Sequence, residues 1–452
     1  GGLRMIRLKT KISVRARIRE TVSSFIENGK MQKSAFIFRL LILSLLFLTF
    51  VTGYGNKNAF NFDKIDDYAR SVKLKPNERP GDLAIRLTKN ASTDIEKARA
   101  IFVSLTENIR YDTESYFSGR NEPRTLEEIL HSGKSVCQGY SDLFETMSRS
   151  AGLEAVTISG WAKGASYSPD TFMSGSTNHA WNAVRIEGKW YLVDCTWGAG
   201  YLSGREYIKH FDEFYFFTPP EQLIHTHFPK NNDWQLLEPK MTKEKYLSIP
   251  KSWPNCFRCG VELLSDVYEN MRVREEETFQ FGVNEGSAML VTLYGPDRNP
   301  RKAQVFVQRS GNMYEVRTRF AEKGNYELHI YARKETDDDP LFHSAIAISL
   351  INAYAYGLQK DFPETYSLFQ EREAVLLYPM ERRLQANESV AFRIVVPDAE
   401  EVVVINGGEW NYLEPDKDVF TGNVRVQAGD VFILARFESD NIYRYLVRYV
   451  AE

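Results

Sequence analysis

The chain is poor in cysteine, in net charge and in long apolar runs. Its 452 residues contain four cysteines, which excludes a disulfide-dense scaffold. The formal net charge is −3, so the composition gives no electrostatic case for a nucleic-acid partner, and none is expected. With 43% hydrophobic and 26% charged residues, the chain has the composition of a globular protein long enough for two or three domains.

One apolar run, residues 40–51, follows a basic segment near the N-terminus. Residues 1–34 are rich in lysine and arginine, and Glu20 and Glu27 are their only acids. The run is too short to cross a bilayer comfortably but suits the apolar region of a signal peptide. We therefore expect residues 1–55 to be a basic extension plus a signal peptide, and the protein to be exported. A membrane anchor at 40–51 is the alternative, and whether residues 1–30 are translated stays open.

Hydrophobic periodicity divides the remaining chain into a mixed region and an all-β region. Residues 56–89 are polar and predict a linker with a short helix. Residues 90–245 alternate helical and strand patterns, which predicts an α+β domain. Beyond them, turns recur about every ten residues, and the alternation of apolar side chains predicts two β-sandwiches, at 255–350 and 365–452. The first is expected to be Ig-like, because Tyr326 follows Gly324-Asn325 as in the approach to a tyrosine corner.

A cysteine lies at the start of a predicted amphipathic helix. From Gln138 to Ala151 the apolar residues recur at helical spacing, and Gly152 stands where a helix-ending glycine belongs. Cys137 therefore falls at the helix N-terminus, where unpaired backbone N–H groups and the helix dipole favour a thiolate. Taken alone, such a cysteine is either a nucleophile or a buried core residue.

A predicted β-hairpin supplies the partners that a cysteine nucleophile needs. His179 opens one strand, Glu187–Lys189 forms the turn, and Asp194 ends the second strand. An antiparallel hairpin places His179 and Asp194 near each other at its open end. A helix packed on this sheet would bring Cys137 over His179, which gives a nucleophile, a base and an orienting carboxylate.

Three blocks of this region resemble the transglutaminase-like superfamily, whose fold is papain-like. They are Ser135-Val136-Cys137-Gln138-Gly139-Tyr140, Asn178-His179-Ala180-Trp181-Asn182 and Tyr191-Leu192-Val193-Asp194-Cys195-Thr196-Trp197-Gly198-Ala199-Gly200. Arg110-Tyr111-Asp112 and the segments 215–220 and 224–228 point to the kyphoscoliosis peptidase and hillarin branch. The resemblance covers about residues 90–240. It implies that Cys137 is the nucleophile, His179 the general base and acid, and Asp194 the orienting carboxylate.

Further residues are candidates for the substrate cleft or for structural roles. The cleft candidates are Tyr111, Tyr116, Gln138, Trp181 and Trp197. Cys195, next in sequence to Asp194, should point to the opposite face of its strand and pack in the core. The lone C-x-x-C of Cys256 and Cys259 is weak evidence for zinc, and a local disulfide or two packed thiols is expected instead. His225 and His227 could ligate a metal, but a structural role is preferred. No cofactor or metal is expected.

The sequence thus predicts an α+β papain-like core, with the Cys-bearing helix packed on an antiparallel sheet, followed by Ig-like sandwiches. The expected function is an exported cysteine peptidase or transglutaminase-like enzyme that acts on peptide or protein amides through a Cys137 thioester. The β-modules would contact a protein or cell-wall partner. The alternative is a catalytically silent transglutaminase-like fold that acts as a protein-interaction or scaffold module. Hydrolysis and transamidation are not distinguished.

Overall fold

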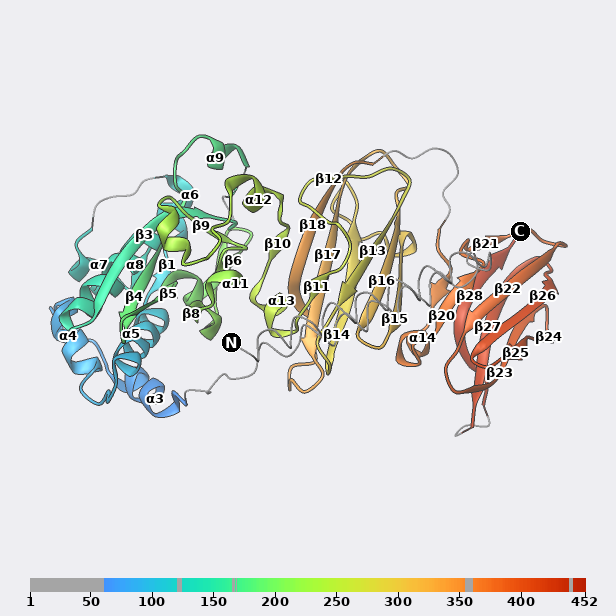
Figure 1. The fold of residues 1–452 in the computed structure, drawn as a ribbon, viewed down its shortest axis with the longest axis horizontal. Helices are drawn as coiled ribbons and strands as arrows, with labels where there is room; N and C mark the ends of the chain where they lie inside the picture. The colour runs from blue at the N-terminus through green and yellow to red at the C-terminus, as the bar shows by residue number, and fades with distance from the viewer. Residues whose placement is uncertain (1–60, 120–123, 165–166, 168, 354–360, 439–441) are drawn as a thin grey trace, which may run out of the picture. The chain divides into compact units, whose positions relative to one another are not determined.

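A computed structural model describes residues 61–119, 124–164, 167, 169–353, 361–438 and 442–452 (Figure 1). The signal peptide or anchor expected at 40–51 lies outside the described residues. Within these ranges, no helix is both long and apolar enough to cross a membrane.

The first domain begins with helices that share one core. Two of them, α3 and α4, fall in residues 56–89, where a linker with one short helix was expected. Their apolar residues Ile65, Leu83 and Leu87 join the core of the domain, so this segment is part of the domain. The helices of this half are α3 (Asp63–Ser71), α4 (Pro80–Leu87), α5 (Asp94–Asn108), α6 (Thr113–Ser118), α7 (Leu126–Ser132) and α8 (Cys137–Ser150).

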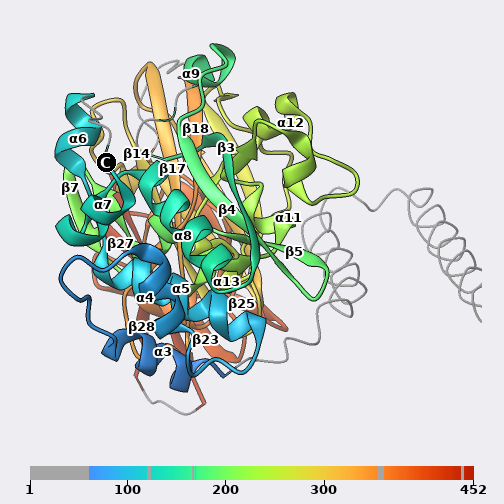
Figure 2. The same ribbon diagram turned by 90° about the vertical axis from the view of Figure 1, so that its left-hand side faces the viewer.

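A five-stranded antiparallel sheet in the order β8-β5-β4-β3-β9 forms the other layer. Helix α8 packs on its central strands β3 and β4 (Figure 2). The side chains predicted to form the apolar face of α8, including Tyr140, Leu143 and Phe144, are fully buried. The strands are β3 (Glu154–Ala162), β4 (His179–Ile186), β5 (Lys189–Val193), β8 (Phe216–Thr218) and β9 (His227–Pro229).

Short elements connect these layers. Strands β1 (Arg110–Tyr111) and β2 (Lys134–Ser135) pair in parallel just before α8. Strands β6 (Gly200–Ser203) and β7 (Glu206–Lys209) form a separate hairpin. The short helices are α9 (Pro169–Met173), α10 (Cys195–Ala199), α11 (Pro220–Leu223) and the 3-10 turns η2 (Glu213–Tyr215) and η3 (Asn232–Gln235).

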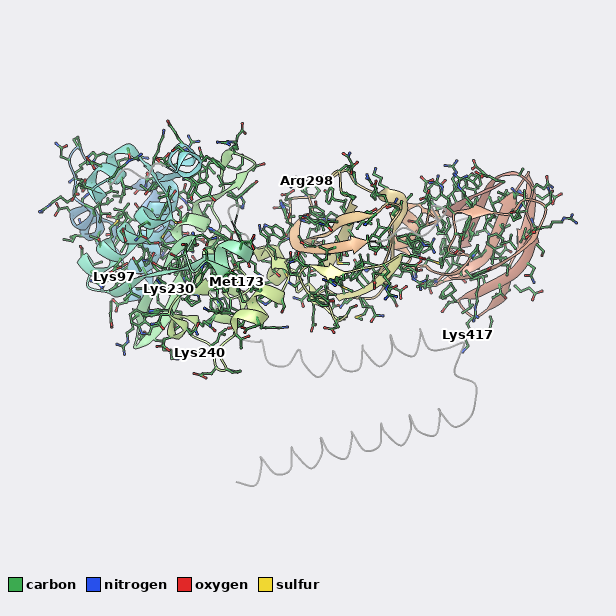
Figure 3. All side chains as sticks on the ribbon, turned by 90° about the horizontal axis from the view of Figure 1, so that it is seen from above. Lys97, Met173, Lys230, Lys240, Arg298 and Lys417 are labelled. Atoms are coloured by element: carbon green, nitrogen blue, oxygen red, sulfur yellow. The ribbon has the colours of Figure 1, made fainter. Side chains whose placement is uncertain are left out.

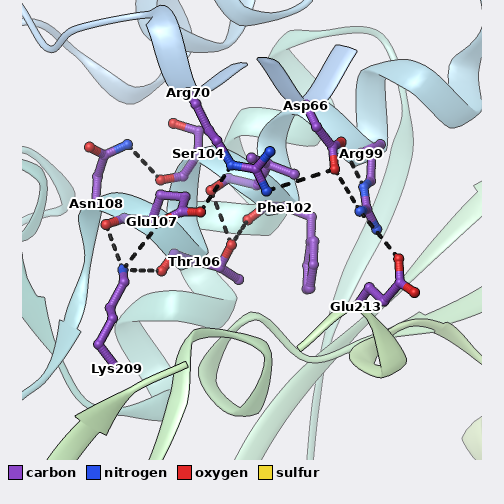
Figure 4. Close-up of polar contacts among 11 residues, drawn as sticks. Asp66, Arg70, Arg99, Phe102, Ser104, Thr106, Glu107, Asn108, Lys209 and Glu213 are labelled. Atoms are coloured by element: carbon purple, nitrogen blue, oxygen red, sulfur yellow. Dashed lines mark hydrogen bonds and ion pairs between the residues drawn. The ribbon is translucent and has the colours of Figure 1, made fainter. Parts of the chain in front are cut away.

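A buried ion pair ties α3 to α5. The Arg99 guanidinium donates to both carboxylate oxygens of Asp66, at 2.8 and 2.7 Å, and both side chains are almost fully buried (Figure 4). The guanidinium also lies 4.8 Å from the ring centre of Phe62 and 5.1 Å from that of Phe216. Because Phe216 begins β8, this cluster links the helical layer to the sheet.

Gly160 allows β9 to approach β3 closely. A Cβ at this position would lie 2.3 Å from the Phe228 carbonyl oxygen and 2.5 Å from the Trp181 ring. We predict that Gly160→Ala lowers the free energy of unfolding by roughly 1–3 kcal/mol, as overpacking does elsewhere. Denaturant unfolding measures the change, and Ser159→Ala on the exposed side of the same strand is the control. Equal stability of the two variants would contradict this packing.

The first β-sandwich confirms the Ig-like prediction. Its sheets have the orders β10-β18-β17-β14, with β12 paired to β18, and β11-β13-β16-β15. The Tyr326 hydroxyl donates to the Glu322 carbonyl at 3.0 Å, as a tyrosine corner requires. The elements are α12 (Lys243–Ser248), β10 (Lys251–Ser252), α13 (Pro254–Arg258), β11 (Glu262–Leu263), β12 (Met271–Arg272), β13 (Glu276–Gly282), β14 (Ser287–Tyr294), η4 (Lys302–Gln304), β15 (Val305–Ser310), β16 (Met313–Arg319), β17 (Gly324–Lys334) and β18 (His343–Ala353).

A second β-sandwich follows, with its own buried core. Its sheets have the orders β19-β28-β27-β23-β24, with β21 paired to β28, and β20-β22-β26-β25. Lys417 is exposed in the turn between β25 and β26 (Figure 3). The elements are β19 (Glu364–Thr365), α14 (Ser367–Glu371), β20 (Val375–Tyr378), β21 (Arg383–Leu384), β22 (Ser389–Val395), β23 (Ala399–Asn406), β24 (Glu409–Tyr412), β25 (Glu414–Asp416), β26 (Val419–Arg425), β27 (Gly429–Phe437) and β28 (Arg444–Ala451).

Candidate active site

Cys137 is the first residue of α8 and is half-buried. The chain reaches it from β2 through Val136, whose extended backbone marks the helix start. The glycine two residues later has a packing reason, because a Cβ on Gly139 would lie 2.1 Å from Ser135 Oγ and 2.6 Å from Ile129 Cδ1. The Cys-Gln-Gly run therefore lets α7, β2 and the first turn of α8 meet closely around the cysteine.

The β4–β5 hairpin brings His179 and Asp194 together, as the strand pattern predicts. His179 Nε2 lies 2.7 Å from Asp194 Oδ2, and both side chains are buried. Asp194 also caps α10, since its Oδ1 accepts the backbone N–H groups of Thr196 at 2.8 Å and Trp197 at 2.9 Å. Asp194 follows β5 and begins a helix, so the expectation that Cys195 continues the strand is wrong. Cys195 is nevertheless buried in the core.

The Asp194 carboxylate is held ionised in a buried place. Burial alone would raise its pKa, but the charge of His179 and hydrogen bonds from His179 and His227 hold the pKa well below its usual range. The same pairing acts on His179 in the opposite sense. Burial lowers the His179 pKa, but the Asp194 charge and hydrogen bond, together with Cys137, raise it to about 10. His179 is therefore an imidazolium at neutral pH.

The cysteine responds to this imidazolium. Burial raises the pKa of the Cys137 thiol, but the hydrogen bond and charge of His179 and the backbone N–H of Ala180 outweigh it, so the pKa lies below its ordinary value. The His179 nitrogen that faces Cys137 is Nδ1, because Nε2 is bonded to Asp194. The arrangement favours a thiolate beside an imidazolium, and the N-terminal position on α8 favours the thiolate further.

Aromatic rings enclose the histidine. The Trp181 ring is stacked at 6.0 Å from His179, and the Trp197 ring lies 5.6 Å away. Trp181 is fully buried and thus belongs to the core as much as to the site. Tyr111 and Tyr116 are in ring contact at 5.4 Å. Burial and the Cys137 charge raise the pKa of Tyr111, which keeps its hydroxyl protonated beside the thiolate.

Gln138 lies apart from these rings. Its side chain is exposed on α8, and its amide donates to Asp142 at 2.8 Å. The side-chain amide is thus engaged within α8.

A second histidine belongs to this site and was not predicted to do so. His227 Nε2 lies 3.0 Å from the same Asp194 oxygen that His179 contacts. His179, Asp194 and His227 offer three ligand atoms within 4.8 Å of one another, but these atoms already pair in hydrogen bonds. The sequence flagged His227 only as part of His225-Thr226-His227, and no spacing pointed to Asp194.

The remaining cysteines are structural. Cys256 and Cys259 are free thiols buried in the core of the first β-sandwich, so of the two expectations the packed thiols are confirmed and the disulfide is not. Burial raises the pKa of Cys256 to about 12 and also raises that of Cys259. These two thiols are therefore inert at neutral pH, in contrast to Cys137.

Family models match the first domain and the first β-sandwich. The transglutaminase-like superfamily matches residues 81–195, which include Cys137, His179 and Asp194, and the KY-like immunoglobulin-like domain matches residues 243–361. Mouse kyphoscoliosis peptidase is 31% identical over 329 residues, which are 63% of this chain and 49% of that protein. Hillarin of Drosophila melanogaster is 30% identical over 46% of this chain and 27% of its own length. Cytokinesis protein 3 of Schizosaccharomyces pombe is 26% identical over 46% and 24%.

These relatives correct the functional expectation. They include a protein named for cytokinesis, together with hillarin and kyphoscoliosis peptidase. This set of relatives contradicts the prediction of an exported enzyme that cleaves or transfers amides. The alternative, a transglutaminase-like fold that serves as an interaction or scaffold module, fits better. The chain spans half or less of the length of these relatives.

The fold itself is one that carries cysteine-type enzymes. The helix start at Cys137, the hairpin of His179 and Asp194 and the Ig-like sandwich that follows all agree with the matched families. The chain carries a transglutaminase-like domain of the kyphoscoliosis peptidase and hillarin branch, followed by a KY-like immunoglobulin-like domain.

Proposed function

We propose that this protein is an interaction module whose second β-sandwich docks a partner protein, while the transglutaminase-like domain is a further part of the scaffold. The observation that carries the proposal is a group of aromatic side chains on the outer face of the sheet that contains β23, β24, β27 and β28. We name it the aromatic band. It consists of Tyr366, Trp410, Tyr412, Tyr443 and Tyr445.

The band is continuous across the strands. Tyr412 on β24 pairs with Val403 on β23, which pairs with Leu434 on β27, and Leu434 pairs with Tyr445 on β28. Val403 and Leu434 are buried, but neither belongs to the core between the two sheets, so they form the floor of the band. Trp410 packs on Tyr443 at 5.0 Å.

The band is exposed in spite of its apolar character. Trp410 is 48%, Tyr412 59% and Tyr445 48% exposed. Aromatic residues gathered in this way are typical of protein interfaces. The arginines beside the band are paired, because Arg436 contacts Glu400 and Glu401, and Arg448 contacts Asp430. This surface therefore suits an apolar protein segment better than a polyanion.

The proposal predicts that partner binding depends on the band and not on Cys137. The tagged full chain is used to recover partners that are identified and quantified by mass spectrometry, with wild type, Trp410→Ala/Tyr412→Ala and Cys137→Ala compared. We expect the double variant to reduce the recovered partner at least about tenfold, as loss of two aromatic interface anchors does, and Cys137→Ala to retain it.

Tyr378→Ala is the matched control, since Tyr378 is 52% exposed on β20 of the other sheet. Retention of the partner by the band variant, or its loss in Cys137→Ala or Tyr378→Ala, would overturn the interaction proposal.

A second candidate function is that of a cysteine-type enzyme at Cys137. It is favoured by the His179–Asp194 bond and the lowered Cys137 pKa. In this role the Cys137 thiolate attacks the carbonyl carbon of an ester or other acyl donor, and the leaving oxygen takes the His179 proton as its bond to carbon breaks. Asp194 holds the His179 ring during the transfer.

An activated ester with a chromogenic leaving group tests this second function. We expect one acyl group per chain on wild type, seen by intact-mass measurement, and none on Cys137→Ala. Acylation of Cys137 at the same rate in His179→Ala would contradict the proposed role of the imidazolium.

A further inference from the structure

His227 reaches Asp194 from a strand that lies outside the hairpin of the site. It begins β9, where it pairs with Ala162 of β3. Its side chain is fully buried. The imidazole is surrounded by the rings of Trp197 at 4.5 Å and Trp181 at 5.2 Å. A polar side chain in such a place needs defined partners.

Both ring nitrogens of His227 have a partner. Nε2 lies 3.0 Å from Asp194 Oδ2, and Nδ1 lies 2.8 Å from the Thr226 hydroxyl. An ionised carboxylate can only accept, so Nε2 carries the proton. Nδ1 of a neutral ring can only accept, and it competes for the Thr226 hydroxyl proton with the Leu223 carbonyl oxygen, which lies farther away at 3.3 Å. For a neutral ring, the bond to Asp194 assigns the tautomer that carries its proton on Nε2.

Its surroundings keep His227 neutral. The titratable groups that face it are Asp194, the His179 imidazolium at 5.3 Å between ring centres, and Tyr215 at 6.5 Å. Burial lowers the pKa of His227 and the positive charge of His179 adds to this, against the opposing effect of Asp194. The site thus holds one charged and one neutral histidine on a single carboxylate.

We propose that His227 is a positioning residue that locks the Asp194 carboxylate, so that His179 presents its free nitrogen to Cys137. This inference rests on the cysteine site proposed above. Asp194 Oδ1 is fixed by the backbone of Thr196 and Trp197, and Oδ2 by the two histidines. Without His227, Asp194 Oδ2 loses one of its two hydrogen bonds. The carboxylate can then rotate, so that His179 is held less firmly and stabilises the Cys137 thiolate less well.

The test is the pH profile of Cys137 alkylation by iodoacetamide in the full chain. The groups that face Cys137 are His179, Asp194 and Tyr111. We expect His227→Ala to raise the apparent pKa of alkylation by about one unit, the size expected for loss of one hydrogen bond to a charged group. His227→Gln can place an amide N–H on Asp194 and should keep the wild-type profile. Subtraction of the Cys137→Ala signal removes labelling of other thiols.

The outcomes separate the inference from the function on which it rests. A wild-type profile with a low apparent pKa, shifted in His227→Ala and restored in His227→Gln, supports the positioning role. A low wild-type pKa that His227→Ala leaves unchanged overturns that role and leaves the cysteine site intact. An ordinary thiol profile in wild type overturns the cysteine site and the inference with it.

Thr226→Val provides a second variant if His227→Ala does not fold. It removes the hydroxyl that lies beside both Nδ1 and the Leu223 carbonyl, so the ring can take its proton on Nδ1 and lose the bond to Asp194. We expect a shift in the same direction, smaller than one unit. A wild-type profile in a folded Thr226→Val, with the same melting temperature, would overturn the assigned tautomer and the positioning role.

Discussion

Replacing His179 with alanine should slow the alkylation of Cys137 at pH 6 at least about tenfold, since an ordinary thiol with a pKa near 8.5 is less than about 1% ionised at that pH. The thiolate of a low-pKa cysteine is a weaker nucleophile, which offsets part of the difference in ionised fraction. The rate is measured with iodoacetamide and corrected with Cys137→Ala.

The direction in which the alkylation rate depends on pH follows from the pKa shifts of Cys137 and His179. The Cys137 pKa is lowered and the His179 pKa is raised to about 10, so the alkylation of wild type should begin at a lower pH than that of an ordinary thiol. In His179→Ala the rate should instead rise with pH through the ordinary thiol pKa. His210→Ala is the control, because His210 is exposed and lies outside the site. Equal profiles of wild type and His179→Ala would contradict an activated thiolate.

The second large effect concerns stability. Arg99→Ala should lower the free energy of unfolding by roughly 3–5 kcal/mol, because it removes both hydrogen bonds that Arg99 donates to the buried Asp66 carboxylate and leaves the more distant Arg70, at 4.0 Å, as its ion-pair partner. The variant also removes the contacts of the guanidinium with the Phe62 and Phe216 rings. Denaturant unfolding of the full chain measures the loss in the transition of the first domain.

Arg79→Ala is the matched control for Arg99→Ala. Arg79 pairs with Asp82 in a similar contact, at 2.9 Å, but its side chain is 73% exposed. Pairs of this kind contribute little to stability. A loss in Arg99→Ala no greater than that in Arg79→Ala would show that the α3–α5 link does not stabilise the domain as its burial indicates.

The local parts of the site could be predicted from the sequence. The span of α8 follows from helical spacing, and its end follows from Gly152, which has a left-handed backbone with φ of 83°. The approach of His179 to Asp194 follows from a tight hairpin, whose turn residue Gly188 also has positive φ. Both features depend on interactions within a few residues, which periodicity and turn chemistry report.

The features that were missed depend on long-range packing. His227 lies 33 residues beyond Asp194 and meets it only because β9 adds to the edge of β3. Asp194 begins α10 because its side chain caps that helix, which is too short to show a periodic pattern. The segment 56–89 is polar overall, but the few apolar residues of α3 and α4 face the domain core. These roles become visible only when the residues that contact one another in the folded domain are known.

The two proposed functions use different surfaces of the chain. The aromatic band is on the second β-sandwich, and the cysteine site is in the transglutaminase-like domain. An interaction module can keep an ion-paired cysteine without using it for turnover, because the His179–Asp194 bond also satisfies buried polar groups. The charge state of Cys137 is therefore the property on which the account of the site depends.

The most direct test of that charge state is the ultraviolet absorbance of the thiolate, followed against pH in the full chain and in Cys137→Ser. We predict a Cys137-dependent thiolate signal that appears at a pH below the ordinary cysteine pKa of about 8.5. A signal that appears only as the pH passes about 8.5 would contradict the thiolate–imidazolium pair.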